Sequence, residues 1–241
     1  MTSSENREAR LLALLQKRFT QPHPLAYVLR GIGDDAAVLS PCTHSLVLSV
    51  DAQVQDVHFR HGYLDWHTLG RRAYMVSASD LAAMGAKPHV ALAALTLPLS
   101  IDDTMFDELC SGMADAATDI GAPIIGGNLS TGSLLSLTMT VMGTVEGHAI
   151  QRDGAKPGHR IYVTGTLGAA ALGLYCLEHG ITTSQATPFI KRWRFPQARI
   201  QEGLSLCASA SSAIDLSDGL YIDLKRVCQS SGVGAKIDSA K

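Results

Sequence analysis

Several features that would define a function are scarce in this sequence. Aromatic residues make up only 5% of its 241 residues, there is no run of Lys or Arg, and the formal net charge is −2. The sequence therefore offers neither aromatic residues for base stacking nor a basic patch for phosphate contacts, and we expect no nucleic-acid partner. No apolar run is long enough to span a membrane, and the N-terminal segment has no signal-peptide pattern. We therefore expect a cytoplasmic protein without membrane contact.

Cysteine chemistry and the common catalytic motifs are also missing. The five cysteines are scattered, odd in number and form no Cys-x-x-Cys motif. This favours reduced core thiols over disulfides or a zinc site. There is no Gly-Lys-Ser/Thr of a Walker A loop, no Ser/His/Asp arrangement and no cysteine with a paired base. Covalent catalysis is therefore not expected.

The segments that are present predict a mixed fold. Strand-like and helix-like patterns occur together, and 46% hydrophobic residues suffice for a sizeable core. The segment from Gln151 to His159, which includes Lys156-Pro157-Gly158, predicts a joint between two domains, residues 1–150 and 151–241. Strands are predicted at 36–39, 46–50, 90–97, 134–145, 161–164 and from 235, and helices at 6–19, 65–85, 100–121, 167–179, 200–208 and 220–228.

Acidic residues occur where soluble proteins seldom place them, at the ends of apolar runs or on an apolar helix face. Like charges 4 Å apart repel by roughly 4 kcal/mol at an effective dielectric near 20. A cluster of carboxylates therefore requires cations, and Mg²⁺ bridging phosphate oxygens is the usual solution. The sequence predicts a metal-dependent, phosphate-handling enzyme from four stretches: Gly33-Asp34-Asp35-Ala36, Ser49-Val50-Asp51, Ser79-Asp80-Leu81 and Asp215-Leu216-Ser217-Asp218-Gly219.

Each acidic stretch also has a simpler interpretation. Asp34-Asp35 is equally consistent with an Asx turn that enters a hairpin. Taken alone, Asp51 is better explained as a solvated strand end. Asp80 lies on the apolar line of its helix and must be paired or metal-bound. The alternative to a metal site is an ion pair with Arg71 or Arg72.

Three other features are ambiguous when taken alone. Ser217 or Asp218 is by default an N-cap. Gly126-Gly127-Asn128 either offers backbone N–H groups to phosphate or is a plain turn. His58, between Val57 and Phe59, is by default a satisfied core histidine.

Taken together, these stretches resemble the thiamine-monophosphate kinases, of the superfamily that includes aminoimidazole ribonucleotide synthetase and selenophosphate synthetase. The resemblance spans nearly the whole chain, and its most specific block is Ser79-Asp80-Leu81-Ala82-Ala83-Met84-Gly85-Ala86. The other matches are Gly31-Ile32-Gly33-Asp34-Asp35-Ala36-Ala37-Val38-Leu39, Val50-Asp51 with Val57-His58-Phe59, Arg152-Asp153-Gly154-Ala155-Lys156-Pro157-Gly158, Ile161-Tyr162-Val163-Thr164-Gly165, and Ala213-Ile214-Asp215-Leu216-Ser217-Asp218-Gly219-Leu220.

The resemblance implies a two-domain fold, α/β plus α+β, like that of aminoimidazole ribonucleotide synthetase. Its N-terminal domain has a mixed sheet with helices and dimerises, and its second domain is incomplete here. The implied reaction moves the γ-phosphoryl group of ATP onto the phosphate of thiamine monophosphate, without a covalent intermediate. The resemblance assigns several Mg²⁺ ions to Asp34, Asp35, Ser49, Val50, Asp51, Asp80, Asn128, Asp215 and Asp218, ATP to Gly127, Asn128, Arg152 and Ser217, and the thiamine phosphate to His58.

The chain departs from the family pattern in three places. Gly126-Gly127-Asn128-Leu129 replaces the usual Gly-Gly-Asp-Thr, which removes one negative charge. Gln55-Asp56 replaces the usual Glu-Gly before Val-His-Phe. The sequence stops at Lys241, where family members continue, so contacts to the thiamine ring are expected beyond it.

Two alternatives to this kinase remain. The first is another ATP-dependent enzyme of the superfamily with a different acceptor. The second is a catalytically silent nucleotide-binding remnant, which Asn128 and the early end favour. The remaining acidic residues argue against a remnant, because an unused carboxylate cluster only destabilises a fold.

Overall fold

A mixed four-stranded sheet forms the centre of the N-terminal half, with strand order β3-β6-β4-β5. The computed structural model describes residues 3–21 and 25–238. The strands β3–β6 and β6–β4 pair antiparallel and β4–β5 pair parallel. This architecture confirms the predicted mixed sheet. The strands are β3 (Ser45–Val54), β4 (Lys87–Leu97), β5 (Ile124–Thr131) and β6 (Ser136–Val145).

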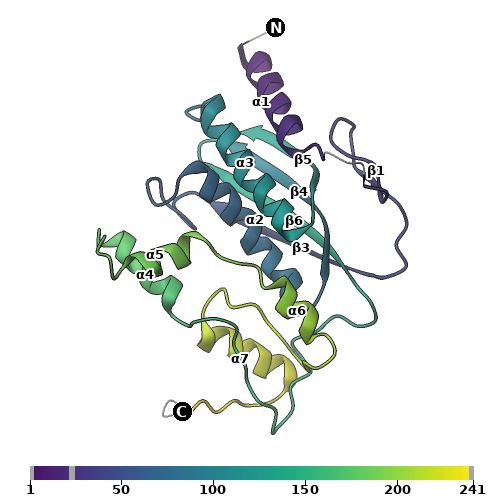
Figure 1. Cartoon of the computed structure of the whole chain (residues 1–241), viewed down its shortest axis with the longest axis vertical. Coiled ribbons are helices and arrows are strands. Elements are labelled where there is room, and N and C mark those ends of the chain that lie inside the picture. Colours follow the sequence, from purple (N-terminus) through teal and green to yellow (C-terminus); the bar gives the residue numbers. More distant parts are fainter. Residues whose placement is uncertain (1–2, 22–24, 239–241) are drawn as a thin grey trace.

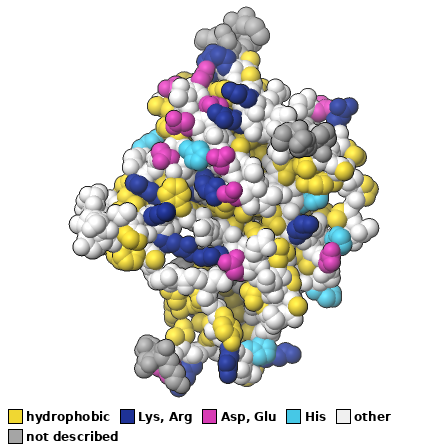
Figure 2. Space-filling model, in the orientation of Figure 1, with side chains coloured by type: hydrophobic (Ala, Val, Ile, Leu, Met, Phe, Trp, Pro, Cys, Tyr) yellow, Lys and Arg dark blue, Asp and Glu magenta, His cyan; other side chains and the backbone are white. Residues whose placement is uncertain are grey.

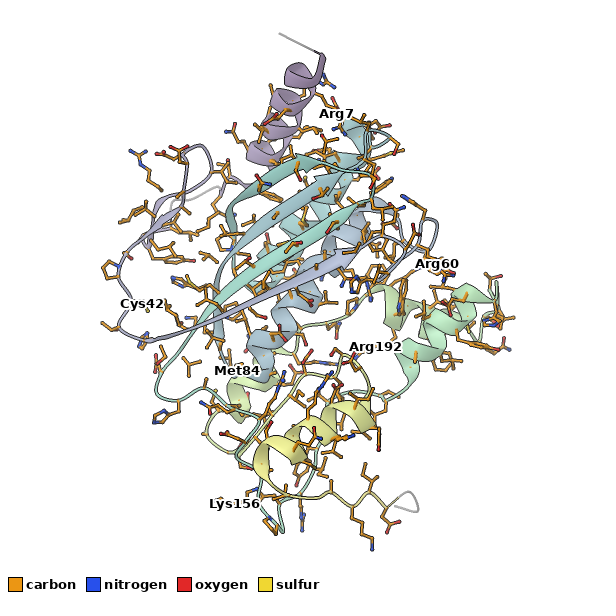
Figure 3. The ribbon with its side chains drawn as sticks, turned by 180° about the vertical axis from the view of Figure 1, so that it is seen from behind. Arg7, Cys42, Arg60, Met84, Lys156 and Arg192 are labelled. Atoms are coloured by element: carbon orange, nitrogen blue, oxygen red, sulfur yellow. The ribbon has the colours of Figure 1, made fainter. Side chains whose placement is uncertain are left out.

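Helices cover one face of this sheet and leave the other face open. In Figure 1, α2 (Trp66–Ala83) and α3 (Asp103–Ile120) lie in front of the strands, with α1 (Ser3–Phe19) at the upper end. Figure 3 shows the molecule from behind, with the strands in front of these helices. The alternation of buried and half-exposed residues along β6 follows from this one-sided cover.

The ends of α2 and α3 are fixed by local chemistry. The carboxylate of Asp65 accepts a hydrogen bond from the Thr68 N–H at 2.6 Å, and Gly85 follows the helix at φ +65°. These ends confirm the prediction for 65–85. The predicted start of α3 at residue 100 is wrong, because the Asp102 carboxylate, which accepts from the Met105 N–H at 2.8 Å, provides the N-cap.

A small two-stranded sheet lies beside the β5 edge. It consists of β1 (Val28–Arg30) and β2 (Val38–Leu39), which pair antiparallel. Gly31, directly after β1, lies so close to β5 that a Cβ added to it would lie 3.6 Å from the Ile125 carbonyl oxygen. The loop that carries Asp34 and Asp35 therefore starts at the β5 edge.

The described part of the C-terminal half, up to residue 238, contains helices and no strand. The helices are α4 (Ala169–Glu178), α5 (Thr187–Arg194), α6 (Ile200–Leu206) and α7 (Leu220–Ser231). The strands predicted at 161–164 and from 235 are wrong for these residues, because no neighbouring strand supplies backbone partners. Trp193 and Ile200 of this half belong to the same buried core as α2 and α3.

Lys, Arg, Asp and Glu side chains lie close together over the upper helices in Figure 2. Between α1 and α3, Arg10 pairs with Asp103 at 2.8 Å. None of the helices within residues 3–21 and 25–238 is both long and apolar enough to cross a membrane. All five cysteines are free, but Cys42 and Cys207 are exposed, so the prediction of core thiols is wrong for these two.

Candidate functional site

Strand β3 and helix α2 bring three predicted site residues together. Ser49 and Asp51 are half-buried, whereas their neighbours Leu48 and Val50 are exposed, so Ser49 and Asp51 point toward the helix-covered face. The Ser49 hydroxyl donates a hydrogen bond to Oδ2 of Asp80, on the last turn of α2. The predicted orientation of Asp80 toward the core side of its helix is therefore confirmed.

The alternative explanation for Asp80, a structural ion pair, does not apply. Arg71 pairs instead with Asp119 of α3 at 2.5 Å. Arg72 donates to the backbone carbonyl of Trp193, and its guanidinium carbon lies 4.5 Å from the centre of the Trp193 ring. Both arginines are thus engaged elsewhere, and Asp80 has no cationic partner among the described residues.

Asp215 adds a third carboxylate from the C-terminal half. Burial is the main cause that raises the pKa of Asp215 to about 6, and the charges of Asp80 and Asp223 add to it, whereas Arg152 opposes it. The segments that carry Asp215 and Arg152 pair directly, since the Ala213 N–H donates to the Gln151 carbonyl at 3.1 Å. The hydrogen bond between these two segments therefore brings the Arg152 guanidinium near the Asp215 carboxylate.

Asp51 belongs to the same electrostatic environment. Burial raises its pKa, and the negative charge of Asp80 acts in the same direction. The Ala52 N–H, which donates to the Asp51 carboxylate at 3.1 Å, and the nearby His58 both oppose this shift. Asp51, Asp80 and Asp215 are referred to below as the acidic group, because each of them influences, or is influenced by, another member.

His58 lies on the surface next to the acidic group, and not in the core. Its Nδ1 accepts a hydrogen bond from the Val54 N–H at 3.0 Å. The proton of the neutral ring must then be on Nε2, which is left as a donor. His58 also lines a cavity of about 70 Å³ that extends to Arg60 and Tyr63 on the same loop and to Leu174 and Glu178 of α4. The default interpretation, a satisfied core histidine, is therefore wrong.

The loop before His58 contains a residue in the left-handed conformation. Asp56 stands where the family usually has glycine, and its φ is +63°. Glycine reaches this left-handed conformation without cost, and aspartate is among the residues that tolerate it best. The Gln55 amide donates to the Asp56 carboxylate at 3.2 Å. Gln55 and Asp56 are thus hydrogen-bonded to each other in a turn whose conformation glycine also adopts readily.

A second set of predicted residues lies at the opposite edge of the sheet. It contains Asp34, Asp35, Gly127 and Asn128, and is called the β5-edge group below. Asp34 accepts a hydrogen bond from the Asp35 N–H at 3.0 Å and lies 4.0 Å from Arg30. These local contacts are those of the simpler turn interpretation, and both carboxylates are exposed.

The register of the sheet separates the two groups within one chain. Asp51 pairs with Met139, Met139 with Ala93, and Ala93 with Gly127. Three strand spacings of 4.7–4.9 Å place Gly127 about 14 Å from Asp51. Asn128 is in the next row, beside the exposed Ala94, so its side chain lies on the open face. Val50 also faces outward and is apolar, so only its backbone carbonyl is a candidate ligand.

Gly127 lies inside a strand and not in the predicted loop. Its φ is +152°, and a Cβ added to it would lie 1.9 Å from the carbonyl oxygen of Ala93 on β4. Close packing of the two strands therefore requires glycine here. Because β5 is an edge strand, its outer backbone groups have no partner strand within the described sheet.

The loop from Asp215 to Gly219 is organised by two residues that sequence reasoning missed. Asp223, on the first turn of α7, is fully buried, and its Oδ2 accepts from the N–H groups of Asp218 at 3.1 Å and Gly219 at 3.0 Å. Arg226 binds Asp218 at 2.6 Å and Asp223 at 2.8 Å. The i,i+3 spacing of Asp223 and Arg226 after Ser217-Asp218-Gly219 was the available signal.

The donor chemistry of the acidic group fits Mg²⁺. In residues 3–21 and 25–238, no three His, Cys, Asp or Glu side chains converge closely enough to hold one ion by themselves. Mg²⁺, however, usually binds one or two protein carboxylates and completes its octahedron with phosphate oxygens and water. Asp80, Asp51 and Asp215 offer such carboxylates, and Ser49 offers a hydroxyl oxygen.

The fold and the acidic residues define a class, the AIR synthase related proteins. The model of their N-terminal domain matches residues 33–145, and that of their C-terminal domain matches residues 156–241. More specifically, the chain belongs to the thiamine-monophosphate kinase family. It is 41% identical over 215 residues to thiamine-monophosphate kinase of Escherichia coli K12, an alignment that covers 87% of this chain and 65% of that protein.

Solved structures agree with this assignment. Thiamine-monophosphate kinase from Stenotrophomonas maltophilia K279a superposes with a TM-score of 0.82 at 34% identity, over 92% of this chain and 72% of that chain. AaThiL, complexed with AMPPCP and TMP, gives a TM-score of 0.76 at 29% identity over 96% and 72% of the two chains. The chain spans slightly less than two thirds of the length of the first curated relatives.

Proposed function

We propose that this chain phosphorylates thiamine monophosphate, using ATP, to give thiamine diphosphate and ADP. The main support is the acidic group, in which Asp51, Asp80 and Asp215 from three separate segments share one electrostatic environment beside His58. The relation to AaThiL, which was solved with AMPPCP, an analogue of ATP, and TMP, supports the choice of both substrates. A phosphate acceptor is already nucleophilic at neutral pH, so no strong base is needed.

The residues of the chain would act by positioning and charge. Mg²⁺, when bound, would neutralise charge on the transferring phosphoryl group. The acidic group would hold the ions against the polyphosphate, and Arg152 would bind its outer oxygens. The Nε2–H of His58 would donate to the phosphate of the acceptor and orient it for in-line attack. Asp34, Asp35, Gly127, Asn128, Ser217 and Asp218 would complete the metal and ATP contacts.

A homodimer would bring the β5-edge group of a second copy to β3, the edge strand whose helix-covered side carries Asp51, whereas one chain keeps the two groups about 14 Å apart. The open face of β3 carries three exposed apolar side chains, Leu46, Leu48 and Val50. Exposed apolar stripes of this kind mark contact surfaces. We propose that the sheet of a second copy covers this stripe, so that β5 of one copy approaches β3 of the other. We also propose the domain division at residue 150, and a cytoplasmic location, which the five free thiols support.

The test is the formation of both products by the purified chain, given ATP, Mg²⁺ and thiamine monophosphate. We expect ADP and thiamine diphosphate in equal amounts, and loss of both in Asp80→Asn with an unchanged circular dichroism spectrum. Asp119→Asn is the matched control, since it removes a carboxylate that only pairs with Arg71. Near-normal turnover in Asp80→Asn would contradict the metal assignment.

Asn128 favours a second candidate, a nucleotide-binding protein without turnover. Its amide replaces a carboxylate of the family pattern and so weakens the attraction for a divalent ion. Thermal stabilisation by Mg²⁺ and AMPPCP, with no product from thiamine monophosphate, would support this candidate. A severalfold gain of turnover in Asn128→Asp would identify Asn128 as the weakened ligand.

A further inference from the structure

Asp223 is an acidic residue that is completely buried and is not one of the predicted site residues. Removing a carboxylate from water costs several kcal/mol unless partners replace the lost hydration. Asp223 has three such partners: the N–H groups of Asp218 and Gly219 donate to Oδ2 at 3.1 and 3.0 Å, and Arg226 Nη1 donates to Oδ1 at 2.8 Å. Two of these partners belong to the loop that precedes α7, and the third, Arg226, lies on the same helix as Asp223.

Arg226 links the Asp223 carboxylate to the side chain of Asp218. While Nη1 binds Asp223, Nη2 of the same guanidinium binds Oδ2 of Asp218 at 2.6 Å. A planar fork of this kind fixes direction as well as distance. The backbone and the carboxylate of Asp218 are thus both set from α7, by Asp223 and Arg226 respectively.

A role in capping the helix explains only part of these contacts. Gly219 provides no side-chain cap for α7, so a carboxylate that accepts its N–H has a structural use. The Arg226–Asp218 bond satisfies no backbone group of the helix. It orients a side chain that the proposed function assigns to the metal ions.

We propose that Asp223 and Arg226 are positioning residues for the loop 215–219, holding Asp215, Ser217 and Asp218 where the metal–nucleotide complex binds. This inference rests on the proposed function. Residues that orient ligands from behind typically change metal affinity by about 10- to 100-fold when removed. Asparagine has only one acceptor oxygen, so at position 223 it can accept only some of the hydrogen bonds that the Asp223 carboxylate accepts.

The experiment measures binding of Mn²⁺, a probe for Mg²⁺, by electron paramagnetic resonance with saturating AMPPCP. We expect Asp223→Asn to weaken Mn²⁺ binding about tenfold. Asp102→Ala is the stability control, since it removes an equivalent N-cap carboxylate from α3. It should lower the melting temperature and leave Mn²⁺ binding unchanged.

Arg226→Lys provides a second test if Asp223→Asn does not fold. Lysine keeps the charge but cannot bind two carboxylates in fixed directions, so Mn²⁺ binding should weaken severalfold. Lys225→Arg, the reverse change at the neighbouring exposed position, should have no effect.

Three outcomes would overturn the inference. Unchanged Mn²⁺ binding in both Asp223→Asn and Arg226→Lys refutes only the positioning role and leaves the proposed function intact. Equal weakening in Asp102→Ala assigns the effect to stability. Absence of Mn²⁺–AMPPCP binding by the unsubstituted chain refutes the proposed function together with the inference.

Discussion

Replacing Asp215 by Asn is expected to stabilise the protein while impairing its proposed activity. Burial and the charges of Asp80 and Asp223 raise the pKa of Asp215 from 3.8 to about 6. A raised pKa means that the folded state favours the neutral form. The ionised carboxylate therefore destabilises the fold above pH 6, and asparagine removes this cost.

The magnitude follows from the pKa and the exposure of the side chain. A shift of about two pKa units corresponds at most to about 3 kcal/mol. Asp215 is only partly buried, so solvent screening reduces this to about 1–2 kcal/mol. For a chain of this size the melting temperature should rise by about 3–6 °C at pH 7.5. Between pH 6 and pH 4 the unsubstituted protein takes up the proton, and the difference should disappear.

The assay is thermal unfolding of both proteins from pH 4 to pH 8 in the presence of EDTA, with product formation measured in parallel with Mg²⁺. Asp218→Asn is a useful comparison, because Asp218 is neutralised by Arg226 and should gain no stability. The electrostatic argument would be refuted if Asp215→Asn melted at a lower temperature than the parent. It would also be refuted if the difference in melting temperature stayed the same from pH 4 to pH 8.

Three further predictions test other parts of the structure. Gly127→Ala should lower the free energy of unfolding in urea by about 3 kcal/mol or more, because its Cβ would overlap the Ala93 carbonyl. Gly126→Ala is the control, since its Cβ would meet only the Leu92 side chain, at 3.2 Å. Equal losses in the two variants would contradict the assigned register. Asp56→Gly should raise stability by up to about 1 kcal/mol by relieving its positive φ, and a loss would mean that its bond with Gln55 matters more. Leu48→Glu should give monomers in light scattering if the open face of β3 is the dimer contact, and unchanged dimers would exclude that face.

Local patterns carried the correct part of the sequence prediction. The helical period that put Asp80 on an apolar line depends only on nearby residues, and Gly85 and Gly121 ended their helices as predicted. The mixed sheet was implied by the resemblance to the thiamine-monophosphate kinases and not by local patterns, and the structure confirms it. Strand order is different, because it is decided by contacts between distant segments, so the separation of Asn128 from Asp51 had no signal in the sequence.

The errors share a physical origin as well. The apolar run at 161–164 has strand character, but a strand forms only where another strand supplies hydrogen bonds, and none is adjacent in the described residues. Gly126-Gly127-Asn128 has turn composition, yet the approach of β4 requires glycine within a strand. Asp223 was overlooked because an acidic residue on the first turn of a helix is usually solvated.

The division of the acidic residues into two groups bears directly on the Asn128 departure. The acidic group keeps all three carboxylates, including Asp215, whose ionisation the fold disfavours. The substitution of an acid by an amide falls in the β5-edge group, on the open face. If a second copy brings the two groups together, we expect the ion held with Asn128 to bind more weakly than an ion held by Asp80 and Asp215, because electrostatic attraction to Mg²⁺ depends on the number of carboxylates. The departure would then lower the affinity for one ion and leave the centre of the site intact.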